Sequence, residues 1–144
     1  MPNSDRYCTF GIGSLKLALC VDCLVEVLDD VELTRVPLAL PPVVGLMNLR
    51  GQVVTAVDFR SDLLPEGEEP DPLALAMVVE LEENEVAIMV DSVGDVTPPE
   101  SVTLQPVPPT ISGRLRELAD HVFQFEDQAV VVLSSKRISR TVES

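Results

Sequence analysis

The sequence is poor in aromatic and basic residues and contains no tryptophan. Aromatic side chains make up 3% of the 144 residues, and 10 lysines and arginines stand against 24 aspartates and glutamates, which gives a formal net charge of −14. Nucleic acids and anionic membranes both need clustered cations, so this balance argues against either as a partner. The hydrophobic share of 46% argues against disorder, because disordered acidic chains are poor in apolar residues.

Long apolar runs and paired cysteines are also missing. The first ten residues contain no segment fit for a signal peptide, and no stretch approaches the roughly 20 apolar residues of a membrane span. Cys8, Cys20 and Cys23 are an odd number, which fits a reducing compartment better than a disulfide framework. The sequence therefore predicts a cytoplasmic protein with a single domain over residues 1–144, large enough to fold without disulfides or a metal.

The apolar residues, mostly valine and leucine, occur in short runs about every ten residues, with polar turns between them. This spacing is typical of a β-barrel or sandwich. The acidic connector Ser61–Pro72 divides the chain into two halves, which predicts two small barrels. The candidate strands are Arg6–Gly13, Leu15–Val21, Val31–Pro37, Leu46–Leu49, Val53–Val57, Leu73–Leu81, Glu85–Val90, Val102–Pro106, His121–Phe125 and Ala129–Leu133.

Residues that carry catalytic or metal chemistry are few. Cys20 and Cys23 form a CxxC pair, but a zinc site needs a second ligand pair, and a thioredoxin-type redox site needs the pair at the start of a helix. The residues that flank the pair are apolar, which favours buried, inert thiols. His121 is the single histidine, and nothing in the sequence places a nucleophile beside it. Gly11 and Gly13 lack the third glycine of a dinucleotide loop. We therefore expect no enzyme activity, no cofactor and no metal site.

The most informative segment is Gly45–Arg60, which reads GLMNLRGQVVTAVDFR. Arg50 and Gly51 stand where a tight turn between two strands is expected. An arginine flanked by apolar residues either emerges at the rim of the fold or needs a partner, and Glu26 in an apolar stretch is a candidate. The alternative is that both are unrelated surface residues.

This segment resembles the GVINLRGxIVPVVDLR motif of the CheW family of chemotaxis coupling proteins. Four further segments resemble motifs of that family in the same order: V-x-E-I, T-x-I-P, G-x-x-V-D-x-V-x-x-V and x-P-x-P. They are Leu24–Val27, Thr34–Pro37, Ile88–Val96 and Gln105–Pro108. The resemblance extends from about Tyr7 to Ile138, nearly the whole chain.

The resemblance implies a mainly β fold of two intertwined five-stranded SH3-like barrels with a few short helices. The approximate sub-barrels are 14–66 and 67–144, with an N-terminal strand at 5–13. It also implies a non-catalytic adaptor that bridges the cytoplasmic tip of a chemoreceptor, a methyl-accepting chemotaxis protein, to the regulatory domain of a CheA-type histidine kinase. Such an adaptor is recruited to receptor arrays and has no direct contact with nucleic acid or the membrane interior.

The resemblance also implies two sets of binding residues. The receptor tip is expected in a groove between the barrels, at positions that match Leu24, Glu26, Gly45, Arg50, Leu75, Val93 and Val96. The kinase is expected on a separate apolar face near Arg35, Val36, Leu38 and Val43.

The sequence departs from the family pattern at Cys20, Asp22, Thr55, His121 and Ser134. These departures suggest a divergent paralogue, for example one that serves a gliding-motility pathway of the Frz type. One alternative is a paralogue that binds the receptor but has lost or weakened kinase binding. The other is a small redox or metal protein that uses Cys20 and Cys23.

Overall fold

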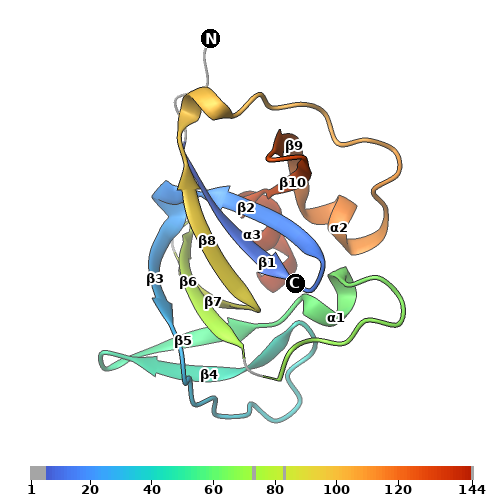
Figure 1. The fold of residues 1–144 in the computed structure, drawn as a ribbon. Helices are drawn as coiled ribbons and strands as arrows, with labels where there is room; N and C mark the ends of the chain where they lie inside the picture. Colours follow the sequence, from blue (N-terminus) through green and yellow to red (C-terminus); the bar gives the residue numbers. More distant parts are fainter. Residues whose placement is uncertain (1–5, 73, 83, 144) are drawn as a thin grey trace.

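A computed structural model describes residues 6–72, 74–82 and 84–143, and in this part of the chain ten strands form two five-stranded sheets (Figure 1). The first sheet has the order β8-β1-β2-β10-β9 and the second has the order β3-β6-β7-β5-β4. The strands of the first sheet are β1 (Tyr7–Ile12), β2 (Leu15–Cys20), β8 (Ser92–Thr97), β9 (Ala119–Phe125) and β10 (Gln128–Leu133). Those of the second are β3 (Leu24–Leu28), β4 (Val43–Leu49), β5 (Gln52–Val57), β6 (Leu75–Leu81) and β7 (Asn84–Val90). The predicted mainly β fold with two five-stranded units is confirmed.

Short helices occupy the connections between strands. They are α1 (Arg60–Leu63), α2 (Gly113–Leu118), α3 (Ser135–Glu143) and the 3-10 turns η1 (Val21–Cys23) and η2 (Pro99–Ser101). The backbone N–H of Arg137 donates a hydrogen bond of 3.2 Å to Oγ of Ser134, so Ser134 caps the start of α3.

The two sheets repeat one pattern of strand directions. When the strands of each sheet are taken in the order given above, the first two neighbouring pairs are antiparallel, the third pair is parallel and the last pair is antiparallel. The sheets do not coincide with the expected ranges 14–66 and 67–144, because β6 and β7 pair with β3 and β5 while β2 pairs with β1 and β10. Residues 5, 73 and 144, at the ends of expected ranges, lie outside the described residues.

One edge of each sheet is covered by a neighbouring segment. Thr34 and Leu46 exchange two backbone hydrogen bonds of 2.8 Å along β4, and Gln105 and Val122 exchange bonds of 2.8 and 2.9 Å along β9. At the opposite edges, no segment of the described chain pairs with the outer side of β3 or β8. Each sheet therefore has one covered and one uncovered edge.

The covering segments correct two strand predictions. Val31–Pro37 and Val102–Pro106 are not strands, and each contributes a single bridge. Pro37 and Pro106 end these segments and have no N–H to donate, which prevents a longer ladder at that point.

The main core lies between the two sheets, and each sheet has a smaller core on its other face. The alternation of β6 shows this directly: Met77 and Val79 pack in the shared core, whereas Ala76 and Val78 pack in the core of the second sheet. Phe123 of β9 belongs to the corresponding core of the first sheet. The uncovered edge strands thus lie where the shared core reaches the surface.

Candidate functional site

The uncovered edges β3 and β8 both border the shared core. Leu24 of β3 and Val93 of β8 pack against it, and each remains partly exposed. Both strands lie on the left of the view in Figure 1. Leu75, at the start of β6 beside β3, also packs partly exposed against the same core. These residues thus expose apolar surface at the two uncovered edges, where the family resemblance implies a groove, and this surface is here called the edge groove.

Each wall of the edge groove is shaped by a β-bulge. On β3, the register shifts between Leu24 and Glu26, so that Leu24 pairs with Val79 and Val27 pairs with Met77. Val79 and Met77 both face the shared core, and paired residues share a face of the sheet. The bulge thus lets Leu24 and Val27 face the groove although they are three residues apart.

The wall on β8 repeats this arrangement. Val93 pairs with Phe10 and Val96 pairs with Cys8, across a register shift opposite Thr9. Cys8 and Phe10 lie two residues apart in β1 and so face the same side, which places Val93 and Val96 together. Val96 is 44% exposed, and on β3 Val25 and Val27 are 41% and 38% exposed. The sequence prediction included Val93 and Val96 but missed Val25 and Val27.

Glu26 and Arg50 form an ion pair on the other face of β3, because Glu26 pairs with Val78, which packs in the core of the second sheet. The φ angles of Arg50 and Gly51 are 53° and 86°, as a two-residue type I′ turn between β4 and β5 requires. From this turn, the Arg50 guanidinium donates a hydrogen bond to the Glu26 carboxylate. The side chain of Arg50 is 74% exposed, so it remains accessible to a partner. Of the two alternatives that the sequence left open, the structure shows the ion pair.

Gly45 lies away from the groove. It is buried in β4, at the opposite edge of the second sheet from β3. A Cβ at this position would lie 2.7 Å from the carbonyl oxygen of Thr34, so the absence of a side chain allows the covering segment to approach β4. The close approach of the covering segment explains why position 45 is a glycine, and no contact with a partner protein is needed to explain it.

The residues expected to bind the kinase lie on or near the connection between β3 and β4. Leu38 is 99% exposed at a φ of 65°, and Leu40, which the prediction missed, is 77% exposed. Arg35 is exposed and Val36 is half-buried, whereas Val43 lies in β4 and packs against the shared core. Leu38 and Leu40 therefore present most of the apolar surface of this segment.

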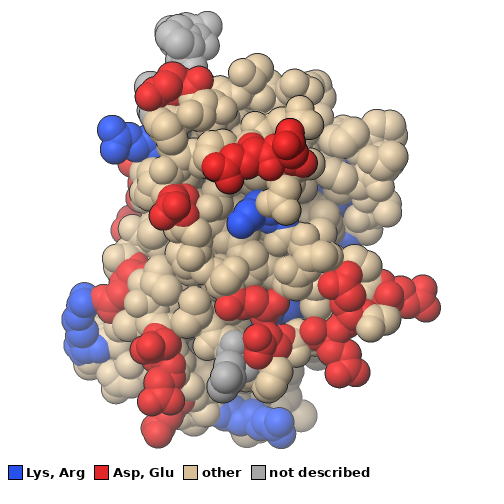
Figure 2. All heavy atoms as spheres, in the orientation of Figure 1, with Lys and Arg blue, Asp and Glu red and all other residues tan. Residues whose placement is uncertain are grey.

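The acidic side chains lie mainly outside the edge groove. Figure 2 shows them in separate groups on this face, with a dense group at the lower right over the connector that follows α1. Glu66, Glu68 and Glu69 of that connector are exposed. The groove residues that pack against the shared core are apolar.

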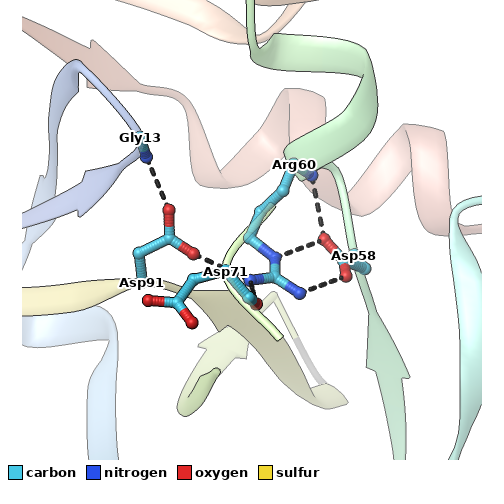
Figure 3. A network of polar contacts seen from close by, with 5 residues as sticks. All are labelled: Gly13, Asp58, Arg60, Asp71 and Asp91. Atoms are coloured by element: carbon cyan, nitrogen blue, oxygen red, sulfur yellow. Dashed lines mark hydrogen bonds and ion pairs between the residues drawn. The ribbon is translucent and has the colours of Figure 1, made fainter. Parts of the chain in front are cut away.

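A buried arginine that the prediction did not single out links several segments (Figure 3). Arg60 is 7% exposed, and its Nε and Nη2 each donate a hydrogen bond of 3.0 Å to the Asp58 carboxylate. Its Nη1 donates bonds of 2.7 Å to Oδ1 of Asp91 and to the carbonyl oxygen of Asp71. Asp91 also accepts a bond of 2.6 Å from the N–H of Gly13, so the network joins the β1–β2 turn to β5, β7 and the connector.

The carboxylates of this network favour the protonated, charged form of Arg60. Burial by itself lowers the pKa of Arg60, but the hydrogen bonds and charges of Asp58 and Asp91 outweigh burial and raise the pKa. Arg60 therefore stays charged and holds the two carboxylates together. Because its polar atoms are occupied by the fold, the network is structural.

The cysteines and the histidine are not arranged as a reactive site. The three cysteines are free thiols, and burial raises the pKa of Cys8 and of Cys23. Within the described ranges, no group of three or more metal-ligating side chains is found. His121 lies in β9, 3.6 Å from the carboxylate of the adjacent Asp120. These observations give no support to a redox or metal function.

The thiols are expected to react slowly with a soluble aromatic disulfide reagent. A raised pKa leaves less thiolate at a given pH, so at pH 7.5 we expect Cys8 and Cys23 to react at least about tenfold more slowly than free cysteine. Protein unfolded in urea is the control, in which all three thiols should react at the rate of the free amino acid. Rapid reaction of Cys23 in the native protein would contradict this prediction.

Comparison with known proteins identifies the class of this fold. The crystal structure of the scaffolding protein TtCheW from Thermoanaerobacter tengcongensis is similar, with a TM-score of 0.75 and 22% identity over 93% of this chain and 90% of that chain. The fold is thus that of a CheW scaffold. A chemotaxis protein CheW from Rhizobium meliloti is 27% identical over 86% of this chain and 80% of its own length. A probable chemotaxis protein CheW from Rhizobium etli is 22% identical over 94% and 87%.

The family model for the CheW-like domain matches residues 6–143, and the chain belongs to this family. It is a non-catalytic scaffold of chemotaxis signalling, of the kind that couples receptors to a CheA kinase. No helix in the described part of the chain is long and apolar enough to cross a membrane.

Proposed function

We propose that the edge groove binds the cytoplasmic tip of a chemoreceptor and that the connection between β3 and β4 binds the regulatory domain of a CheA-type kinase. The observation that carries this proposal is the pair of uncovered edges, whose bulges turn valines outward beside the shared core. The protein would act in the cytoplasm, at receptor arrays. Its assignment to a Frz-type pathway stays a prediction.

The geometry of the edge groove suits a helical partner. A receptor tip is a helical hairpin, and an amphipathic helix places apolar residues along one face at spacings of three and four. Val27 and Val96 provide apolar surface on the two walls of the groove, and Leu75 at the start of β6 packs partly exposed against the same core. Arg50 is largely exposed and would meet a receptor carboxylate while it holds Glu26.

The proposed kinase surface is separate from this groove. Leu38 and Leu40 extend from the connection between β3 and β4, and Arg35 adds a charge beside them. Exposed leucines of this size are typical of residues that become buried in a protein interface. Val43 supports the segment from the core side.

Two separate binding measurements test the proposal. A receptor-tip fragment and a kinase regulatory domain, each alone, are titrated into the protein by calorimetry. We expect both to bind, and each to bind when the other is already present. Binding of the receptor tip alone would favour the paralogue that has lost the kinase, and binding of neither would overturn the proposal.

Replacing Arg50 with glutamate is expected to weaken receptor binding by about tenfold, because it reverses an exposed charge and places a second carboxylate beside Glu26. The free energy of unfolding should fall by less than about 1 kcal/mol, since the Arg50 side chain is largely exposed. Calorimetry and urea denaturation measure the two effects. The double variant Glu26→Arg with Arg50→Glu restores the ion pair in the reverse orientation. If it also restores receptor affinity, binding depends on the ion pair and not on a direct contact of Arg50, and if it does not, one of the two original side chains contacts the receptor.

A further inference from the structure

The charge of the chain is distributed unevenly along the sequence. Residues 113–144 contain five basic and five acidic side chains, so the whole net charge of −14 belongs to residues 1–112. The five basic residues of this C-terminal segment are Arg114, Arg116, Lys136, Arg137 and Arg140. Half of all the lysines and arginines thus lie on α2 and α3, which pack against each other.

Two of these arginines border one open cavity of about 720 Å³. Arg116 comes from α2 and Arg137 from the first turn of α3, and His121, Asp120 and Gln105 complete its polar lining. The cavity lies at β9, whereas the edge groove lies at β8, the opposite edge of the same sheet.

Both arginines are held by the backbone rather than by acidic side chains. Nη1 of Arg116 donates hydrogen bonds of 3.0 and 3.2 Å to the carbonyl oxygens of Pro108 and Ile111. Nη1 of Arg137 donates one of 2.8 Å to the carbonyl oxygen of Ala119. In the part of the chain that the structure describes, no carboxylate forms an ion pair with Arg116 or Arg137.

This anchoring leaves donors available in a fixed position. A guanidinium has five N–H donors, and among contacts between described residues each of the two arginines uses only Nη1. A planar group that is already oriented loses little rotamer freedom when it binds a carboxylate. The two guanidinium groups are therefore prepared to bind acidic groups.

The basic surface continues beyond this cavity. A second cavity shares Asp120 and Arg137 with the first and adds Lys136 and Arg140. The two neighbouring cavities are here called the α3 cleft. Both are open to solvent, which fits an extended chain better than an enclosed small molecule.

We propose that the α3 cleft binds a short acidic peptide segment of a partner protein. Its positive side chains complement carboxylates, and the bound segment needs to be short, because the charge on residues 1–112 repels long polyanions such as nucleic acid. Asp120 lies within the cleft and repels the acidic side chains of a bound peptide, so it limits the affinity for that peptide. The proposal is independent of the receptor and kinase surfaces, which lie elsewhere in the fold.

Titration with a synthetic hexaglutamate peptide tests the proposal on the full chain, with hexaglutamine and inorganic phosphate as matched probes at equal ionic strength. We expect NMR shift changes confined to α2, the start of α3, Gln105 and His121, and an affinity at least about tenfold above that for hexaglutamine. Arg137→Gln and Arg116→Glu should each weaken binding by about tenfold. Asp120→Asn should strengthen it by about threefold, a gain that unfolding cannot produce.

Lys16→Glu on β2 is the control, because it makes the net charge more negative, as the Arg116 variant does, at a residue that lines neither cavity of the α3 cleft. If it weakens binding as much as Arg116→Glu does, the effect is one of overall charge and the proposal fails. Equal affinity for hexaglutamate and inorganic phosphate would also overturn it, since the cleft would then bind a single anion. Salt-sensitive self-association of the protein, seen by sedimentation, would assign the cleft to a second copy and would also count against it.

Discussion

Replacing Arg60 with methionine is expected to lower the free energy of unfolding by about 3–5 kcal/mol, the cost of breaking a buried ion pair by removing one partner. The variant keeps most of the side-chain volume but leaves the carboxylates of Asp58 and Asp91 without their shared cation. It also removes the hydrogen bond from Nη1 of Arg60 to the carbonyl oxygen of Asp71. Because domains of this size are stable by only about 5–15 kcal/mol, the loss should be evident as a shifted urea midpoint.

Arg114→Met provides the matched control. Its carboxylate partners, Asp62 and Glu117, are about half exposed or more, and such pairs contribute less than about 1 kcal/mol. The triple variant Asp58→Asn, Arg60→Met, Asp91→Asn removes the uncompensated charges and should regain part of the lost stability. Equal midpoints for Arg60→Met and Arg114→Met would show that the buried network contributes no more than a surface pair.

Replacing Val96 with aspartate is expected to weaken receptor-tip binding by about 30-fold or more, while kinase binding stays unchanged. The substitution places a charge on the wall of the edge groove, where a bound helix would remove it from water. Leu38→Asp should have the reciprocal effect, with weaker kinase binding and unchanged receptor binding. Calorimetry with each partner measures all four affinities.

Both variants should remain folded, which keeps the comparison interpretable. Val96 is on an uncovered edge and partly exposed, and aspartate tolerates the positive φ of Leu38 better than leucine does. Melting temperatures close to that of the unmodified chain are the control. If either substitution weakens the binding of both partners equally, the receptor and kinase surfaces are not separate, and the assignment of the two surfaces is wrong.

The hairpin around Arg50 was predictable because its signal is local. Arg50 and Gly51 stand between two apolar runs, and the structure places them in a two-residue turn with Glu26 as the partner of Arg50. The Ser134 cap of α3 is equally local. Turn and cap chemistry depends on residues a few positions apart, which a sequence displays directly.

The strand β8 and the groove valines were harder to predict because distant partners determine them. β8 contains Gly94 and Asp95, which have low strand propensity, yet it pairs with β1. Glycine is needed at 94, since a Cβ there would lie 2.5 Å from Oγ1 of Thr9. A strict alternation would likewise place Leu24 and Val27 on opposite faces, and only the bulge against β6 places them together.

The Arg60 network was missed for the same reason. Asp58 and Arg60 are close in sequence, but Asp91 and Gly13 join them only through the pairing of the two sheets. A buried arginine after a strand, with an aspartate two positions earlier, is the signal that a sequence offers for such a network.

The bulges also bear on how the protein avoids self-aggregation. Every edge strand, namely β3, β4, β8 and β9, joins its neighbour across a register shift, whereas the interior pairings are regular. An uncovered edge with a continuous ladder would be a template for the strands of another copy. The interrupted ladder, with Glu26 on β3 and Asp95 on β8, makes such strand addition unfavourable. The same edges can thus stay open for a helical partner without polymerising the free protein.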